Sequence, residues 1–155
     1  MRRRGSAPVR SGLWSAAETG ALARLQSEPL IGELLGRSAT RVPARFVARM
    51  RELALLLAGR AIPVVGASTL ASGDGVAWVE NARGLLIHQV HLDQARVGSY
   101  VIVAPTEWNF HPGGALAAAL LGTAATDLDA VQRRATQLVN SLDPCVACRV
   151  EVAHA

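Results

Sequence analysis

The chain contains no lysine, so arginine supplies all 16 of its Lys-plus-Arg positions and the whole formal net charge of +4. A complete lack of lysine is typical of a coding bias, and we therefore do not take the positive charge as a sign of nucleic-acid binding. Aromatic residues make up only 4% of the sequence, so leucine, valine and alanine must fill most of the core.

Long apolar runs are also missing. The longest uncharged stretches, 61–73 and 113–126, are too short and too rich in Gly, Ala and Pro to cross a bilayer. No apolar segment of signal-peptide length follows the arginines near the start of the chain. We therefore expect a cytoplasmic protein with no membrane insertion.

The 155 residues match the size of one ordinary domain, and a hydrophobic content of 50% can fill its core. Residues 1–13 combine arginines with Gly, Ser and Pro and predict a flexible tail. The remainder, 14–155, is predicted to form a single domain, with a helical part at 14–60 and a part at 75–155 that holds a sheet, helices and a cysteine loop.

Apolar residues recur at helical spacing between residues 40 and 59 and predict an amphipathic helix. Its apolar stripe consists of Phe46, Met50, Leu53 and Leu57. A second stripe, Arg41, Arg45 and Arg49, could meet a phosphate or an acidic partner, but a solvated face is the prediction, since surface helices commonly carry one.

After a predicted loop at 61–75 the pattern becomes extended. Three runs rich in β-branched residues, 76–82, 85–92 and 97–104, predict an antiparallel meander. A short helix then ends near Gly122, and a longer one begins at Thr126, the predicted N-cap, and stops at Asp143 because a residue before proline avoids helical geometry. The predicted class is α+β, with two C-terminal helices leading to the cysteine loop.

The two cysteines of the chain, Cys145 and Cys148, are three residues apart and can be directed at one atom. Zinc would need further ligands, of which His154 is the nearest. A redox pair normally opens a helix after a strand, whereas this pair follows a helix. A soft transition metal with other, non-protein ligands and a pair of inert buried thiols are the remaining alternatives, and the spacing alone does not choose.

Asp143-Pro-Cys-Val-Ala-Cys148 resembles the C-terminal metal-ligand motif of the large subunit of nickel-iron hydrogenases. Two further stretches, Glu80-Asn-Ala-Arg-Gly84 and Val103-Ala-Pro-Thr-Glu-Trp-Asn109, are similar to two other blocks of that family in the same order. The resemblance implies a truncated large-subunit-like fold. It implies that Cys145 and Cys148 are metal ligands, that Arg83 overhangs the metal, and that Pro105 and Thr106 contact a cyanide on iron.

The sequence also departs from that family. No cysteine precedes Cys145, so two of the four nickel thiolates of an active large subunit have no counterpart. Glu151 stands where the family has a histidine, and the sequence stops at Ala155 without the expected cleavable tail. This combination is similar to the HupK/HoxV type of hydrogenase expression and formation protein.

That resemblance implies a non-catalytic scaffold in hydrogenase maturation. Its cargo would be iron carrying cyanide and carbonyl ligands, with nickel the weaker candidate. Its partners would be the hydrogenase large-subunit precursor and chaperones of the HypC/HypD type, and no nucleic acid is expected. The alternatives are a C-terminal fragment of a catalytic large subunit and a small structural zinc or redox domain.

Overall fold

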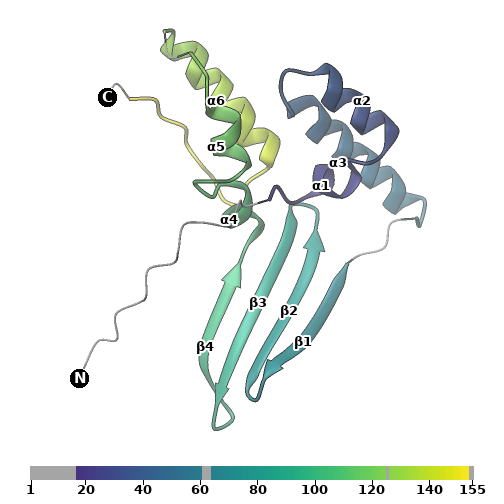
Figure 1. Cartoon of the computed structure of the whole chain (residues 1–155), viewed down its shortest axis with the longest axis vertical. Coiled ribbons are helices and arrows are strands. Elements are labelled where there is room, and N and C mark those ends of the chain that lie inside the picture. The colour runs from purple at the N-terminus through teal and green to yellow at the C-terminus, as the bar shows by residue number, and fades with distance from the viewer. Residues whose placement is uncertain (1–16, 61–63, 125, 154–155) are drawn as a thin grey trace.

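The computed structural model describes residues 17–60, 64–124 and 126–153. Two groups of helices lie at one end of a four-stranded antiparallel sheet, and the other end of the sheet projects away from them (Figure 1). The predicted α+β class, the helical first half and the antiparallel meander are confirmed. The arginine-rich tail at 1–13 lies outside the described residues.

The first group of helices is α1 (Ala21–Leu25), α2 (Pro29–Arg37) and α3 (Val42–Leu57). The strands follow as β1 (Val65–Ala71), β2 (Asp74–Asn81), β3 (Gly84–Asp93) and β4 (Arg96–Val103). The second group of helices is α4 (Pro105–Asn109), α5 (Ala115–Leu120) and α6 (Leu128–Leu142).

Strand β1 occupies a stretch that the sequence predicted to be a loop, because its Gly and Ser residues resemble turn signals. It pairs with β2 so that Gly66 lies opposite Trp78. A side chain at Gly66 would come within 2.3 Å of the indole ring, so the glycine makes room for the tryptophan across the strand pair. The structure also adds α4, which makes three C-terminal helices where two were predicted.

The meander sets the direction of each chain segment. In Figure 1 the β2–β3 turn and the end of β4 both point toward the helices. Arg83 belongs to that turn and Pro105 begins α4 directly after β4. The sheet thus delivers two of the three sequence blocks to the same end of the molecule.

The core of the first half lies between α1, α2 and α3. Leu22 and Ile31 pack against Ala44 and Ala48 of α3, and these residues are at most 4% exposed. Small alanine side chains let the helices approach closely, and leucine and isoleucine fill the remaining space.

The buried face of α3 is therefore not its apolar stripe. Phe46, Met50, Leu53 and Leu57 are 50%, 67%, 51% and 81% exposed, so the predicted apolar face of the amphipathic helix points outward. The spacing of large apolar residues identified the helix but selected the wrong side of it. Hydropathy did not single out alanine and arginine as the inward positions.

Helix α6 begins one residue later than predicted, at a cap formed by Asp127, whose Oδ1 accepts a hydrogen bond from the backbone N–H of Ala130 at 3.0 Å. Its buried residues are Ala135, Leu138, Val139, Ser141 and Leu142. It ends at Asp143, as predicted, with a backbone φ of 53° in the left-handed region. Within the described part of the chain, none of the helices is long and apolar enough to traverse a bilayer.

The exposed stripe and the alanine-lined core give opposite expectations for substitution. Ala48→Leu should lower the free energy of unfolding by about 1–3 kcal/mol, because the closely packed helices leave no room for a larger side chain. Met50→Gln should change it by less than about 0.5 kcal/mol, because the methionine faces solvent. Urea denaturation of both variants measures the difference, and a larger loss for Met50→Gln would contradict this arrangement.

Candidate metal-fragment site

The first of the three sequence blocks along the chain, Glu80–Gly84, forms the β2–β3 turn that carries Arg83. The side-chain Oδ1 of Asn81 accepts hydrogen bonds from the backbone N–H groups of Arg83 and Gly84, at 2.9 and 3.2 Å. Gly84 has a φ of 129°, and a side chain there would meet Thr19 at 2.5 Å. Thr19 comes this close because its hydroxyl accepts a hydrogen bond from the N–H of Leu85 at 2.7 Å. The glycine of the Arg-Gly pair is thus required by the backbone and by its neighbour.

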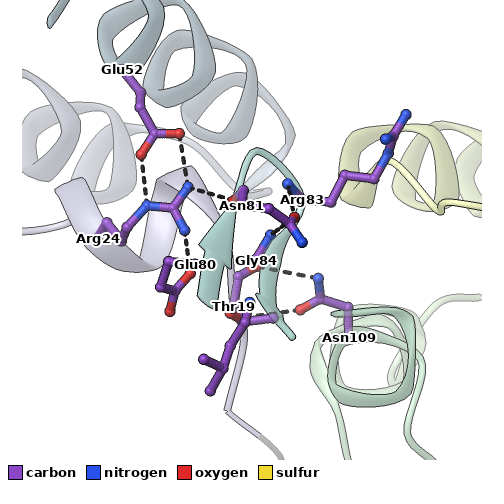
Figure 2. A network of polar contacts seen from close by, with 9 residues as sticks. Thr19, Arg24, Glu52, Glu80, Asn81, Arg83, Gly84 and Asn109 are labelled. Atoms are coloured by element: carbon purple, nitrogen blue, oxygen red, sulfur yellow. Dashed lines mark hydrogen bonds and ion pairs between the residues drawn. The ribbon is translucent and has the colours of Figure 1, made fainter. Parts of the chain in front are cut away.

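A charged cluster ties this turn to the helical half (Figure 2). Arg24 of α1 donates to both carboxylate oxygens of Glu52, at 2.6 and 2.8 Å, and to the carbonyl of Asn81 at 3.2 Å. It also forms an ion pair with Glu80. Burial by itself would lower the pKa of Arg24, but the hydrogen bonds and charges of Glu52 and Glu80 outweigh it and raise the pKa above the ordinary value. Figure 2 shows Arg83 extending away from this cluster.

The second block forms α4, with Pro105 in its first turn, where a missing N–H does no harm. The last residue of α4, Asn109, is only 2% exposed and forms two hydrogen bonds with the backbone of Thr19. The amide oxygen accepts from the N–H of Thr19 at 3.0 Å and the amide nitrogen donates to its carbonyl at 3.2 Å. The segment before α1 is thereby fixed to both blocks, and Thr106 is held in place one residue after the proline.

The third block, the cysteine loop, meets the other two where α6 ends. Asp143 forms an ion pair with Arg83, with 3.4 Å between the guanidinium Nε and Oδ2. Two residues later, the Sγ of Cys145 lies 2.9 Å from the hydroxyl oxygen of Thr106. Segments far apart in the sequence therefore bring an arginine, a hydroxyl and a thiol to one place.

Both thiols are free and exposed, so the alternative of inert buried cysteines does not apply. Cys148 has no hydrogen bond among those found for the described residues. No group of three or more His, Cys, Asp or Glu side chains that could hold a metal ion occurs in the described part of the chain, and His154 lies outside it. What the site offers is a soft sulfur donor, Cys145, beside the hydroxyl of Thr106, with a second thiol three residues further along the exposed loop.

The arginine stripe at α3 is only in part the solvated face that the sequence predicted. Arg45 is 3% exposed, and its guanidinium donates to both oxygens of Glu18, at 2.8 and 3.0 Å, and to the hydroxyl of Ser141 at 2.9 Å. Arg41 contacts Glu18 at 3.3 Å from a more exposed position. Arg49 reaches Asp143. The stripe faces the segment before α1 and the end of α6 because its partners, Glu18, Ser141 and Asp143, lie there.

Of the residues predicted from the sequence, Arg83, Pro105, Thr106 and Cys145 come together, while Cys148 follows in the exposed part of the loop. The roles of five other residues were missed because each depends on a partner far away in the sequence. These are Thr19, Arg24, Arg45, Arg49 and Asn109. Three of them had a local signal, since Arg45 and Arg49 belong to the arginine stripe and Asn109 ends the second block.

Comparison with known proteins gives a consistent result. Residues 30–151 match the family model described as nickel-dependent hydrogenase. The chain is 37% identical over 150 residues to the hydrogenase expression/formation protein HupK of Azotobacter vinelandii, covering 96% of this chain and 39% of that protein. It is 48% identical over 94 residues to the hydrogenase expression/formation protein HoxV of Cupriavidus necator, covering 58% of this chain and 24% of that protein.

A more distant similarity reaches the enzymes themselves. The periplasmic [NiFeSe] hydrogenase large subunit of Desulfomicrobium baculatum is 31% identical over 90 residues, which is 54% of this chain and 17% of that subunit. The resemblance recognised in the three blocks is confirmed, and it extends into α2 and α3, where the sequence motifs gave no indication of it. The chain spans about two fifths or less of the length of these relatives.

The buried Arg45 gives a sharp stability prediction. Arg45→Ala should lower the free energy of unfolding by about 3–5 kcal/mol, because Glu18 would remain almost buried without its buried counter-charge and keep only the exposed Arg41. Arg41→Ala is the matched control, since Arg41 contacts the same carboxylate from an exposed position and should cost at most about 1 kcal/mol. Chemical denaturation of the two variants tests this, and equal losses would show that the burial of Arg45 does not matter.

Proposed function

Because the chain belongs to the nickel-dependent hydrogenase family, we propose that it is a non-catalytic assembly scaffold in nickel-iron hydrogenase maturation. Its cargo is iron carrying cyanide and carbonyl ligands, held for transfer to the hydrogenase large subunit. Cys145 and Cys148 bind the iron, and Arg83, Pro105 and Thr106 line the side that receives the cyanides. The names of the relatives, which are hydrogenase expression and formation proteins, support this proposal.

The observation that carries the proposal is the convergence of the three blocks. Arg83 meets the residue that precedes the loop, and Thr106 meets the first thiol. Cyanide bound to iron is anionic, so hydrogen-bond donors are what it requires, and a guanidinium and a hydroxyl both donate. These donors stand beside sulfur ligands suited to iron.

The number and exposure of the thiols fit a temporary holder. The two cysteines of this chain can supply two thiolates, and the remaining positions on iron are filled by the ligands that the cargo brings with it. Because both thiols are exposed, a donor chaperone of the HypC/HypD type and the large-subunit precursor can each approach the iron. Ligand exchange at an open site requires no unfolding of the scaffold.

A second candidate is a piece of a catalytic large subunit, which the similarity to the Desulfomicrobium baculatum subunit favours. Hydrogen oxidation by the chain itself would establish that function in place of the scaffold. Stoichiometric zinc without iron in the purified protein would instead favour a structural zinc domain.

The cysteines provide the decisive test. In a host that makes the hydrogenase cofactor, anaerobically purified protein should contain iron and show infrared bands of metal-bound carbonyl and cyanide. Cys145→Ala and Cys148→Ala should each lose the iron and both sets of bands, because one thiolate alone holds the fragment poorly. Val146→Ala is the matched control, since Val146 lies between the cysteines, is 64% exposed and offers no metal donor.

Several outcomes would contradict the scaffold. Wild-type protein without iron and without bands would overturn it, as would full retention of the cargo by either cysteine variant. If the wild-type chain holds the cargo, mixing with apo large-subunit precursor should move the bands to that protein, and a failure to transfer would contradict the assembly role.

The proposed contact between the hydroxyl of Thr106 and a cyanide can be tested separately. Thr106→Val keeps the branched shape and removes the donor, so the protein should retain iron while a cyanide band shifts in frequency. Thr106→Ser, which keeps the hydroxyl, should leave the band near its wild-type position. Identical spectra for the valine and wild-type proteins would show that Thr106 does not contact a cyanide.

A further inference from the structure

Two arginines from different halves of the chain approach the same oxygen atom at the start of the cysteine loop. Arg83 Nε lies 3.4 Å from Oδ2 of Asp143, and Arg49 Nη1 lies 3.6 Å from that same oxygen. Arg83 belongs to the three sequence blocks, whereas Arg49 lies on α3, outside all of them. We propose that Arg49 is a positioning residue that acts through Asp143 to fix the cysteine loop. The proposal rests on the proposed function and adds a residue to it.

The guanidinium of Arg49 is itself held in place. It lies over the ring of Phe46, one turn earlier on α3, with 4.7 Å between the guanidinium carbon and the ring centroid. The side chain of Arg49 is only 27% exposed. An arginine that is packed on a ring and mostly withdrawn from water loses less conformational freedom when it forms an ion pair than a free surface arginine does.

Asp143 is well placed to transmit this contact. It has a left-handed backbone, which most residues with a side chain avoid but aspartate tolerates, and its N–H donates to the carbonyl of Asn140 at 3.2 Å. Pro144 follows, so the chain between Asp143 and Cys145 has few conformations. Fixing the carboxylate of Asp143 therefore fixes the direction in which Cys145 leaves α6.

The space beside these three side chains is small, so we take them as a support and not as a second ligand site. Arg49, Arg83 and Asp143 border a common cavity of only about 20 Å³. That space accommodates a water molecule and nothing larger. The two guanidiniums and one carboxylate leave a net positive charge beside the loop, which suits a cargo with anionic ligands.

The test compares the mobility of the loop in metal-free protein with its retention of iron. Arg49→Ala should increase amide hydrogen exchange at the start of the cysteine loop, where the N–H of Asp143 is hydrogen-bonded to the carbonyl of Asn140, by about 1.5- to 5-fold, the range expected for a partly exposed ion pair. Arg49→Lys should restore part of the protection because it keeps the charge. Phe46→Leu should produce a smaller increase because it removes the ring that holds the guanidinium.

The matched control is Arg51→Ala. Arg51 lies on α3 like Arg49, but its ion pair is with Glu28 and not with the cysteine loop. This variant should leave exchange in the loop unchanged. A double-mutant cycle then tests whether Arg49 acts through Asp143. In an Asp143→Asn background, which keeps a residue tolerant of the left-handed backbone, Arg49→Ala should add nothing further.

Two results would overturn the role of Arg49: unchanged loop exchange in Arg49→Ala, or the same increase with and without Asp143. The outcome for the proposed function is read separately. Wild-type protein that never binds iron, together with a loosened loop in Arg49→Ala, would refute the scaffold while supporting the positioning role. Iron-loaded wild-type protein, together with no effect of Arg49→Ala on exchange or iron retention, would support the scaffold and refute the positioning role.

Discussion

The buried guanidinium of Arg45 is the contact on which the arrangement of the site depends. It binds Glu18 before α1 and Ser141 near the end of α6, so three segments of the chain must meet around one charge. A charge that is 97% shielded from water is tolerated only when its partners are in place. Because Ser141 lies two residues before Asp143, the same contact that joins the two groups of helices also determines where the cysteine loop begins.

Within the sequence blocks, most residues build the backbone and few are left for chemistry. Glu80 and Asn81 hold the turn through an ion pair and two backbone hydrogen bonds, and Gly84 allows Thr19 to approach. Asn109 locks α4 to the same threonine. Arg83 and Thr106 remain, and their side chains are the ones that reach the loop. A block of sequence shared with an enzyme family therefore contains two kinds of residue, and the structure separates them.

The sequence predicted those aspects of the fold that depend on local pattern. Alternation and turn residues identified three strands, and the proline after Asp143 located the end of α6. It failed where tertiary contacts decide. The small residues of β1 predicted a loop because the sequence alone does not show that Trp78 lies opposite Gly66 on the neighbouring strand. The arginine stripe of α3 predicted a solvated face because its acidic partners are distant in the sequence. The motifs predicted Arg83, Thr106 and Cys145 as site residues, whereas the contact of Arg49 with Asp143 required the folded chain.

The geometry also bears on why a scaffold and an enzyme can share these blocks and still differ in function. An enzyme gains from a metal enclosed by fixed ligands, since catalysis requires a site that keeps its geometry through many turnovers. A carrier must release its metal, which favours few protein ligands in an accessible loop. In the proposed scaffold, two exposed thiols would supply the ligands, while the contacts of Arg45 and the ion pairs of Arg49 and Arg83 with Asp143 hold the chain where the loop begins. On the proposed function, this division holds the thiols in one direction without enclosing the iron.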